Sequence, residues 1–295
     1  MPVEETVDAS SSDIAKAYAD IAPLALRYWG PNLHYGFWTG PGDTSPIEVA
    51  TARLAAIVIE RLRVRPGDRV LDLGCGYGHP AVEVARATGA HVTAVDIDPR
   101  AVAEAAEHAR RSGLADLVRV TRCDARELPF PENTFDAVLS LESTPHFDIT
   151  ELYPLIRRIL RPGGRLVVET PILLEPMNPA LGKRVADFFD LLRIRSFETP
   201  ETHRETAERS GLRVTELADI TRNVNGSFDR LVRRLRRHRD ELAAEYGAAE
   251  AARLIEVFAG WAQVSEIGAM IMVASRPAAT GTTDEGEGRT WPTHT

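Results

Sequence analysis

The chain has 295 residues, of which 44% are hydrophobic and 26% are charged, and its formal net charge is −8. This length and composition suit a globular protein with one large α/β domain and insertions, or with two small domains, and we expect one domain. A nucleic-acid surface requires a dominating basic field, which the negative charge argues against. We therefore expect a small molecule as the partner.

Cysteine content and the chain ends bear on the compartment. Cys75 and Cys123 are the only two cysteines, and no Cys/His spacing resembles a zinc site, so we expect no metal. Residues 1–13 are acidic and lack the basic and apolar segments of a signal peptide. The late apolar run 269–274 is far too short to span a bilayer. We expect a cytoplasmic protein with no membrane partner, and the sequence does not indicate its oligomeric state.

The first predicted element is a helix beginning near Ser12, in which Ile14, Tyr18 and Ile21 recur at helical spacing. It leads into residues 28–38, an aromatic segment broken by Gly and Pro. Such a segment either forms a lid over a ligand or anchors a loop on the core.

A helix over 47–62 precedes the first strand, which runs into a glycine-rich loop, Gly74, Gly76 and Gly78. Glycines at alternate positions let the strand turn sharply and expose backbone N–H groups, as in nucleotide sites. His79 stands where a dinucleotide fingerprint has its third glycine, so NAD is the weaker interpretation. The helix that follows, from Pro80 to Gly89, directs its N-terminal N–H groups at the ligand.

Acidic residues follow the next two predicted strands, 91–95 and 117–122. Asp96 at a strand end can accept both hydroxyls of a ribose, whereas Asp124 could also be only a turn former. The fourth strand, 135–140, leads into residues 141–147, the kind of loop in which open α/β sheets do their chemistry.

The remaining chain continues the alternation and then departs from it. Strand–helix alternation as far as a fifth strand, 165–169, predicts a parallel sheet with right-handed crossovers. We expect the later elements to be an irregular segment with a helix near the substrate pocket at 172–198, a helix at 201–210, a strand at 213–220, a helical pair around 228–235 and 254–261, a last strand at 269–274, and a disordered tail.

The strand ends, together with the stretch Leu-Pro-Phe-Pro-Glu-Asn-Thr-Phe-Asp-Ala-Val at 128–138, resemble class I methyltransferases that use S-adenosylmethionine (SAM). The likeness covers roughly residues 14–277. It implies a Rossmann-like α/β fold with a seven-stranded, mostly parallel sheet, an antiparallel last strand at its edge, an N-terminal helical lid and helical insertions. Residues 28–38 resemble a segment that closes over SAM in natural-product and sterol-type enzymes, which favours the lid.

The resemblance also implies a division of the chain and a set of cofactor contacts. The expected parts are a helix and aromatic lid at 1–46, a SAM-binding domain at 47–277 with insertions at about 172–198 and 222–264, and a tail at 278–295. Asp72 would lie near the methionine amino group, Ile97 against the adenine face, and Asp124 at the adenine amino group. The implied contacts with SAM, or with the product S-adenosylhomocysteine (SAH), are Tyr18, His34, Asp72, Gly74, Cys75, Gly76, Asp96, Ile97, Asp124, Ala125 and Leu141.

His146 is the candidate catalytic residue, because related small-molecule methyltransferases carry a histidine here that acts as a general base; alternatively it only begins the next helix. Those relatives often place a carboxylate just after the fifth strand, where this chain has Thr170, with Glu142 and Glu169 as weaker substitutes. We expect methyl transfer to a hydroxyl of a small, largely apolar secondary metabolite. N- or C-methylation, a non-catalytic SAM-binding partner protein and an NAD-dependent oxidoreductase are the alternatives.

Overall fold

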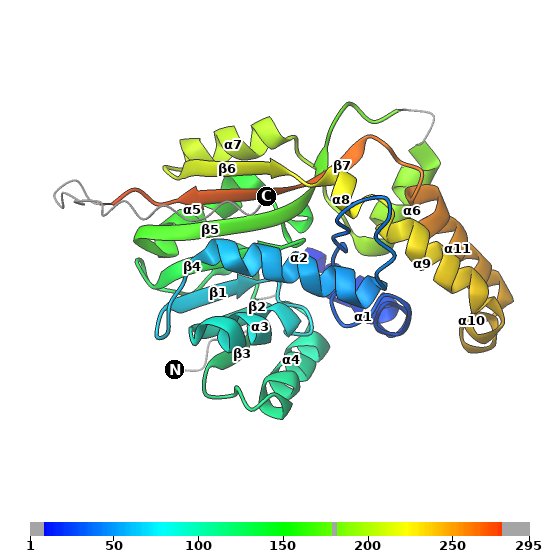
Figure 1. The fold of residues 1–295 in the computed structure, drawn as a ribbon, viewed down its shortest axis with the longest axis horizontal. Coiled ribbons are helices and arrows are strands. Elements are labelled where there is room, and N and C mark those ends of the chain that lie inside the picture. The colour runs from blue at the N-terminus through cyan, green and yellow to red at the C-terminus, as the bar shows by residue number, and fades with distance from the viewer. Residues whose placement is uncertain (1–8, 179–181, 279–295) are drawn as a thin grey trace.

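The protein is built on one seven-stranded sheet, which a computed structural model describes together with its helices over residues 9–178 and 182–278 (Figure 1). The strand order is β3-β2-β1-β4-β5-β7-β6. The strands are β1 Arg69–Leu73, β2 His91–Asp96, β3 Val118–Arg122, β4 Phe135–Leu141, β5 Leu160–Leu173, β6 Arg213–Asp219 and β7 Ile267–Ser275. Neighbours from β3 to β5 pair in parallel, and β7 is antiparallel to both β5 and β6. The predicted fold class is confirmed.

One detail of the sheet was predicted wrongly. The last strand, β7, lies between β5 and β6 rather than at the edge, and β6 is the edge strand. Residues 267–274 are all buried, as expected of an apolar strand covered on both faces, whereas every residue of β6 is exposed or half-buried, so this strand can face solvent. β5 also extends beyond the predicted 165–169, because β7 pairs with it as far as Leu173.

Helices cover both faces of the sheet. One apolar cluster gathers Val70 of β1 with α2 Ile47–Leu62 and α3 His79–Thr88. The next residue, Leu71, points to the opposite face and joins a second cluster under α5 Ile149–Ile159. The other elements flanking the sheet are α4 Pro99–Arg111, α7 Pro200–Arg209 and the short 3-10 turns η1 Ala125–Glu127 and η2 Thr144–His146.

A helical layer stands beyond the sheet at one side of the molecule, on the right in Figure 1. It comprises α1 Ala9–Tyr28, α6 Gly182–Leu192, α8 Thr221–Val224, α9 Ser227–Arg237, α10 Arg239–Tyr246 and α11 Ala248–Trp261. The predicted helical pair is thus a group of helices, with α10 inserted between α9 and α11. A third apolar cluster holds this layer together, in which Phe188 stacks on Trp261 with ring centroids 4.1 Å apart.

Some predictions concern parts that the structure leaves undescribed. Residues 1–8 of the predicted lid and residues 279–295 of the predicted disordered tail lie outside the described residues. The division of the chain into parts therefore stays a prediction. Within residues 9–178 and 182–278, no helix combines the length and the apolar character that crossing a bilayer requires.

Candidate functional site

The glycine loop after β1 serves several purposes at once. Gly74, Gly76 and Gly78 all have positive φ angles, of 74°, 49° and 77°. A Cβ at Gly74 would come within 2.6 Å of Ser143, and one at Gly78 within 2.7 Å of the Ala105 Cβ, so these two glycines permit close packing. A Cβ at Gly76 would meet nothing within 4 Å, and Gly76 lines a cavity. The loop therefore brings bare backbone to a ligand site.

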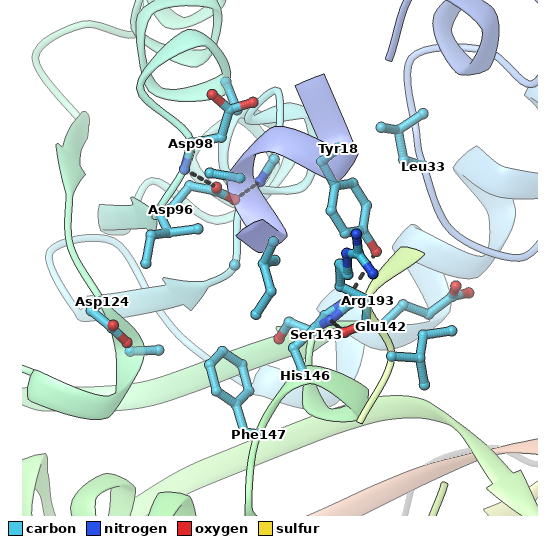
Figure 2. A pocket seen from close by; sticks show the side chains of 18 of the residues that line it. Tyr18, Leu33, Asp96, Asp98, Asp124, Glu142, Ser143, His146, Phe147 and Arg193 are labelled. Carbon is cyan, nitrogen blue, oxygen red and sulfur yellow. Dashed lines mark hydrogen bonds between the residues drawn. The ribbon is translucent and has the colours of Figure 1, made fainter. Parts of the chain in front are cut away.

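The two predicted strand-end carboxylates face this same cavity (Figure 2). Asp96 accepts hydrogen bonds from the N–H groups of Gly76 at 2.8 Å and Asp98 at 2.9 Å. Burial raises the pKa of Asp96, and these backbone bonds oppose the rise. Asp124 accepts from the N–H of Arg126 at 2.9 Å and pairs with its guanidinium at 2.6 Å. Both carboxylates are thus fixed before any ligand arrives.

The cavity has a volume of about 490 Å³ and lies at the carboxyl ends of β1, β2 and β4. Most of the predicted cofactor residues line it, namely Tyr18, Gly74, Gly76, Asp96, Ile97, Asp124, Ala125 and Leu141. His146 also lines it. The volume lies in the range of small-molecule and cofactor sites.

Three predicted contacts do not line the cavity: Asp72, Cys75 and His34. Asp72 is buried behind it, where burial raises its pKa to about 7, and its Oδ2 has no hydrogen-bond partner among the described residues. His34 bonds through Nδ1 to the Tyr35 carbonyl at 2.9 Å, and burial lowers its pKa to about 4. Both side chains are buried outside the lining of the cavity, so their roles as cofactor contacts stay predictions.

His146 is held between two groups from distant parts of the chain (Figure 2). Its Nε2 lies 2.9 Å from the Tyr18 hydroxyl, and its Nδ1 lies 3.3 Å from the carbonyl oxygen of Arg193. A carbonyl can only accept, so Nδ1 carries the hydrogen and Nε2 accepts from Tyr18. Burial lowers the pKa of His146 to about 4, below the ordinary value of 6.5, so the imidazole is neutral at pH 7.

The position at which relatives carry a carboxylate does not supply a partner for His146 here. Thr170 is buried, and its hydroxyl accepts a hydrogen bond from Thr144 at 2.6 Å. The Tyr18 hydroxyl contacts the imidazole instead. The sequence predicts only a cofactor contact for Tyr18, because no local pattern signals a contact with a residue 128 positions away.

Two carboxyl groups lie beside this centre, that of the half-buried Glu142 and that of the buried Glu169. Glu142, the first residue after β4, has a φ of 52°; its N–H donates to the Glu169 carbonyl at 2.9 Å, and its Oε1 accepts from the Tyr35 N–H. The Glu169 side chain is completely buried, and neither carboxyl oxygen has a hydrogen-bond partner among the described residues. Burial raises the pKa of both groups, that of Glu142 to about 8.

A second, apolar pocket of about 110 Å³ adjoins the cofactor cavity. Its wall includes Trp29 and Tyr35 from the aromatic segment, Phe188 from α6, Phe228 from α9 and Phe258 from α11. The residues common to both linings are Tyr18, Leu33, Glu142, His146 and Ile194. The sequence did not identify Arg193 or Ile194 as site residues. The only sequence feature that pointed to this segment was the apolar run 188–192, which directly precedes them.

Known proteins resemble the chain over the residues of both the larger cavity and the apolar pocket. A family model described as a methyltransferase domain matches residues 70–164. The chain is 33% identical over 215 residues to methyltransferase GfsG of Streptomyces halstedii, covering 72% of this chain and 77% of that protein. It is 31% identical to 27-O-demethylrifamycin SV methyltransferase of Amycolatopsis mediterranei, covering 90% and 97%. Other relatives are named as O-, C- and N-methyltransferases.

A solved structure extends the likeness to the helical layer. The [4+2]-cyclase SpnF has a TM-score of 0.79 and 27% identity, and the match covers 92% of this chain and 98% of that one. The similarity therefore includes the glycine loop and strand ends as well as the helices around the apolar pocket.

Proposed function

We propose that this chain, which belongs to the class I SAM-dependent methyltransferases acting on small molecules, transfers the methyl group to a hydroxyl of a small, largely apolar metabolite. One observation carries the proposal: the cofactor cavity and the apolar pocket meet at His146 and Tyr18. An acceptor held by the aromatic wall would present its hydroxyl to a neutral imidazole at the boundary of the two cavities.

The chain's own residues have two tasks in this reaction. SAM supplies an electrophilic methyl group on its sulfonium, so the protein mainly aligns the acceptor with that methyl and removes a proton. Nε2 of His146 has a single lone pair, which the Tyr18 hydroxyl now occupies. The acceptor hydroxyl must therefore displace Tyr18 from Nε2 before His146 can take its proton. The Arg193 carbonyl keeps Nδ1–H in place and thereby the reactive tautomer.

We infer the chemical class of the acceptor from the residues that line the apolar pocket and from the names of the relatives. Aromatic and aliphatic side chains make up most of the pocket lining, which favours an acceptor with an apolar body. A relative similar over nearly its whole length is named for an O-demethylated substrate, which supports a hydroxyl as the acceptor and secondary metabolism as the setting. The net charge of −8 supports our proposal that neither nucleic acid nor an anionic membrane is a partner.

Methyl-labelled SAM tests the proposal directly. The protein would be incubated with ¹³C-methyl SAM and apolar metabolites, each supplied as matched hydroxyl, amine and O-methyl forms. We expect a labelled methoxy carbon from the hydroxyl form, and none from the O-methyl form, in which that oxygen is blocked. Label on nitrogen or carbon would replace O-methylation by the alternative chemistries. SAM binding without label transfer to any form would favour a non-catalytic partner protein.

We also propose a cytoplasmic location. Cys75 and Cys123 are both free thiols, as expected in a reducing compartment.

A further inference from the structure

The sulfonium of bound SAM must lie where the two cavities meet, because its methyl has to face the acceptor. Five side chains line both cavities: Tyr18, Leu33, Glu142, His146 and Ile194. Glu142 is the acidic member of this set. Deprotonation of the acceptor by His146 leaves this carboxyl group without a role.

The backbone around Glu142 holds its carboxyl group at the boundary. Glu142 occupies the left-handed region, which is unfavourable for a residue with a Cβ and persists only where the surroundings impose it. β5 accepts its N–H through the Glu169 carbonyl, and the aromatic segment donates the Tyr35 N–H to its Oε1. The position is thus fixed from two sides.

Groups facing Glu142 from the surrounding elements do not change charge near neutral pH. Glu169 lies behind it with both carboxyl oxygens unpartnered among the described residues, and a carboxyl in that state is protonated. Burial raises the pKa of Tyr18 and of Tyr35 and lowers that of His146, so all three stay neutral. The pKa of Glu142 itself is raised to about 8.

Other charged groups lie on or near the cofactor cavity. Asp96 lines the cavity and is expected to bind the ribose, and Asp72 is buried outside the lining, so both would act on parts that SAM and SAH share. Arg193 and Arg195 also line the cavity, and Arg193 lies beside Tyr18 and His146 (Figure 2). Because arginine cannot be deprotonated in proteins, neither side chain can exchange a proton when the charge on the cofactor's sulfur changes.

The geometry points to Glu142, which lines both cavities, as the residue that distinguishes SAM from SAH: its carboxyl group gives up a proton when the sulfonium binds beside it. The Glu142 O–H bond breaks, the proton goes to solvent, and the carboxylate faces the sulfonium charge. Methyl transfer removes that charge, so the carboxylate takes up a proton again and its attraction for the cofactor is lost. The site would thereby hold SAM and release SAH.

Titration calorimetry of the full chain with SAM and with SAH tests this inference, which rests on the proposed function for the place of the sulfonium but is measured by cofactor binding alone, without an acceptor. A group whose pKa the ligand lowers favours binding at high pH. The ratio of SAM to SAH affinity should therefore rise with pH, by at most about tenfold per pH unit, and level off above the free pKa of about 8. Measurements at pH 7 in buffers of different ionisation enthalpy should show net proton release with SAM, and less with SAH.

Two matched variants locate the proton. Glu142→Gln keeps an oxygen for the Tyr35 N–H but cannot ionise, so we expect loss of the proton release and a flatter affinity ratio. The α-amino groups of both ligands titrate in every variant, so the difference from wild type isolates Glu142. Glu169→Gln resembles the protonated side chain of the other buried carboxyl and should behave like wild type.

Several results would overturn the inference: an unchanged slope in Glu142→Gln, loss of the effect in Glu169→Gln, or equal proton release with SAM and SAH in wild type. The last comparison needs no variant and decides the matter if Glu142→Gln does not fold. A failure to methylate any hydroxyl acceptor would count against the proposed function and leave these binding results unaffected.

Discussion

At the carboxylate end of the proposed cofactor cavity, Asp96 and Asp124 are bonded to backbone N–H groups of their own or the neighbouring loop, whereas at the proposed acceptor end Tyr18 and His146 meet across 128 residues. The first arrangement needs only a strand that ends in the right residue. The second needs α1 and η2 to be packed in one relative position. The two ends can therefore change independently, which suits a family with one cofactor and many acceptors.

The acceptor end depends on aromatic packing for its geometry. Trp29, Phe188, Phe228 and Trp261 belong to one buried cluster that joins the aromatic segment to α6, α9 and α11. The Trp29 indole also donates to the His34 carbonyl at 2.8 Å, which fixes the turn of that segment. Trp29, Leu33 and Tyr35 of this segment line the apolar pocket, and Trp29 also packs in the buried cluster. The segment is thus anchored on the core, and its closing over SAM as a lid stays a prediction.

The largest effect on turnover should come from a substitution at the acceptor end. His146→Ala should lower kcat by about 10²-fold or somewhat more, the low end of general-base effects, because a lowered pKa makes the imidazole a weaker base. SAM affinity should be nearly unchanged. Single-turnover rates together with calorimetry measure both quantities. A variant that loses thermal stability but keeps its rate would reduce His146 to a structural residue.

A substitution of Asp96, at the carboxylate end, should instead weaken cofactor binding. Asp96→Ala removes charge-assisted hydrogen bonds and the support of the Gly76 N–H, so binding of SAM and SAH should weaken alike, by about 1.5–3 kcal/mol. Asp96→Asn, which retains one carbonyl oxygen, should lose less. Calorimetry that finds normal SAM affinity in a folded Asp96→Ala protein would remove Asp96 from the cofactor site.

The pH dependence of turnover should reflect the lowered pKa of His146. An unperturbed histidine would lose activity below about pH 6.5, but burial lowers the pKa of His146 to about 4. Protonation abolishes a general base, so at saturating SAM and acceptor the rate should hold down to about pH 5 and then fall by about tenfold per pH unit. His146→Ala should lack this fall, and circular dichroism at each pH separates it from unfolding.

The smallest effect should follow from loss of the contact between Tyr18 and His146 at the acceptor end. Tyr18→Phe removes the hydroxyl that bonds to Nε2 of His146, a change worth about 0.5–1.5 kcal/mol. If Tyr18 must leave Nε2 before the acceptor binds, the variant should show a lower KM for the acceptor, with SAM affinity close to wild type. A kcat loss as large as that of His146→Ala would instead make Tyr18 part of the proton transfer.

The sheet and the positions of Asp96 and Asp124 at strand ends could largely be predicted from the sequence, whereas their contacts with SAM stay predictions. The glycine loop, Asp96 and Asp124 stand at the ends of apolar runs, and parallel strands bring their carboxyl ends to one edge. The continuous apolar run of residues 267–274 also carried enough information to place β7 inside the sheet, because the alternating residues 213–219 suit an edge better.

The alternation of strands and helices, the glycine loop and the acidic residues at the strand ends could all be predicted from the sequence, because each follows from a pattern among neighbouring residues. Three features of the site could be seen only in the folded chain. Tyr18 faces His146, Glu142 lies at the boundary of the two cavities, and the Arg193 carbonyl sets the tautomer of His146. These contacts join helices and loops far apart in the chain. Their geometry follows from how the aromatic side chains of the helical layer pack, and no local pattern encodes that packing.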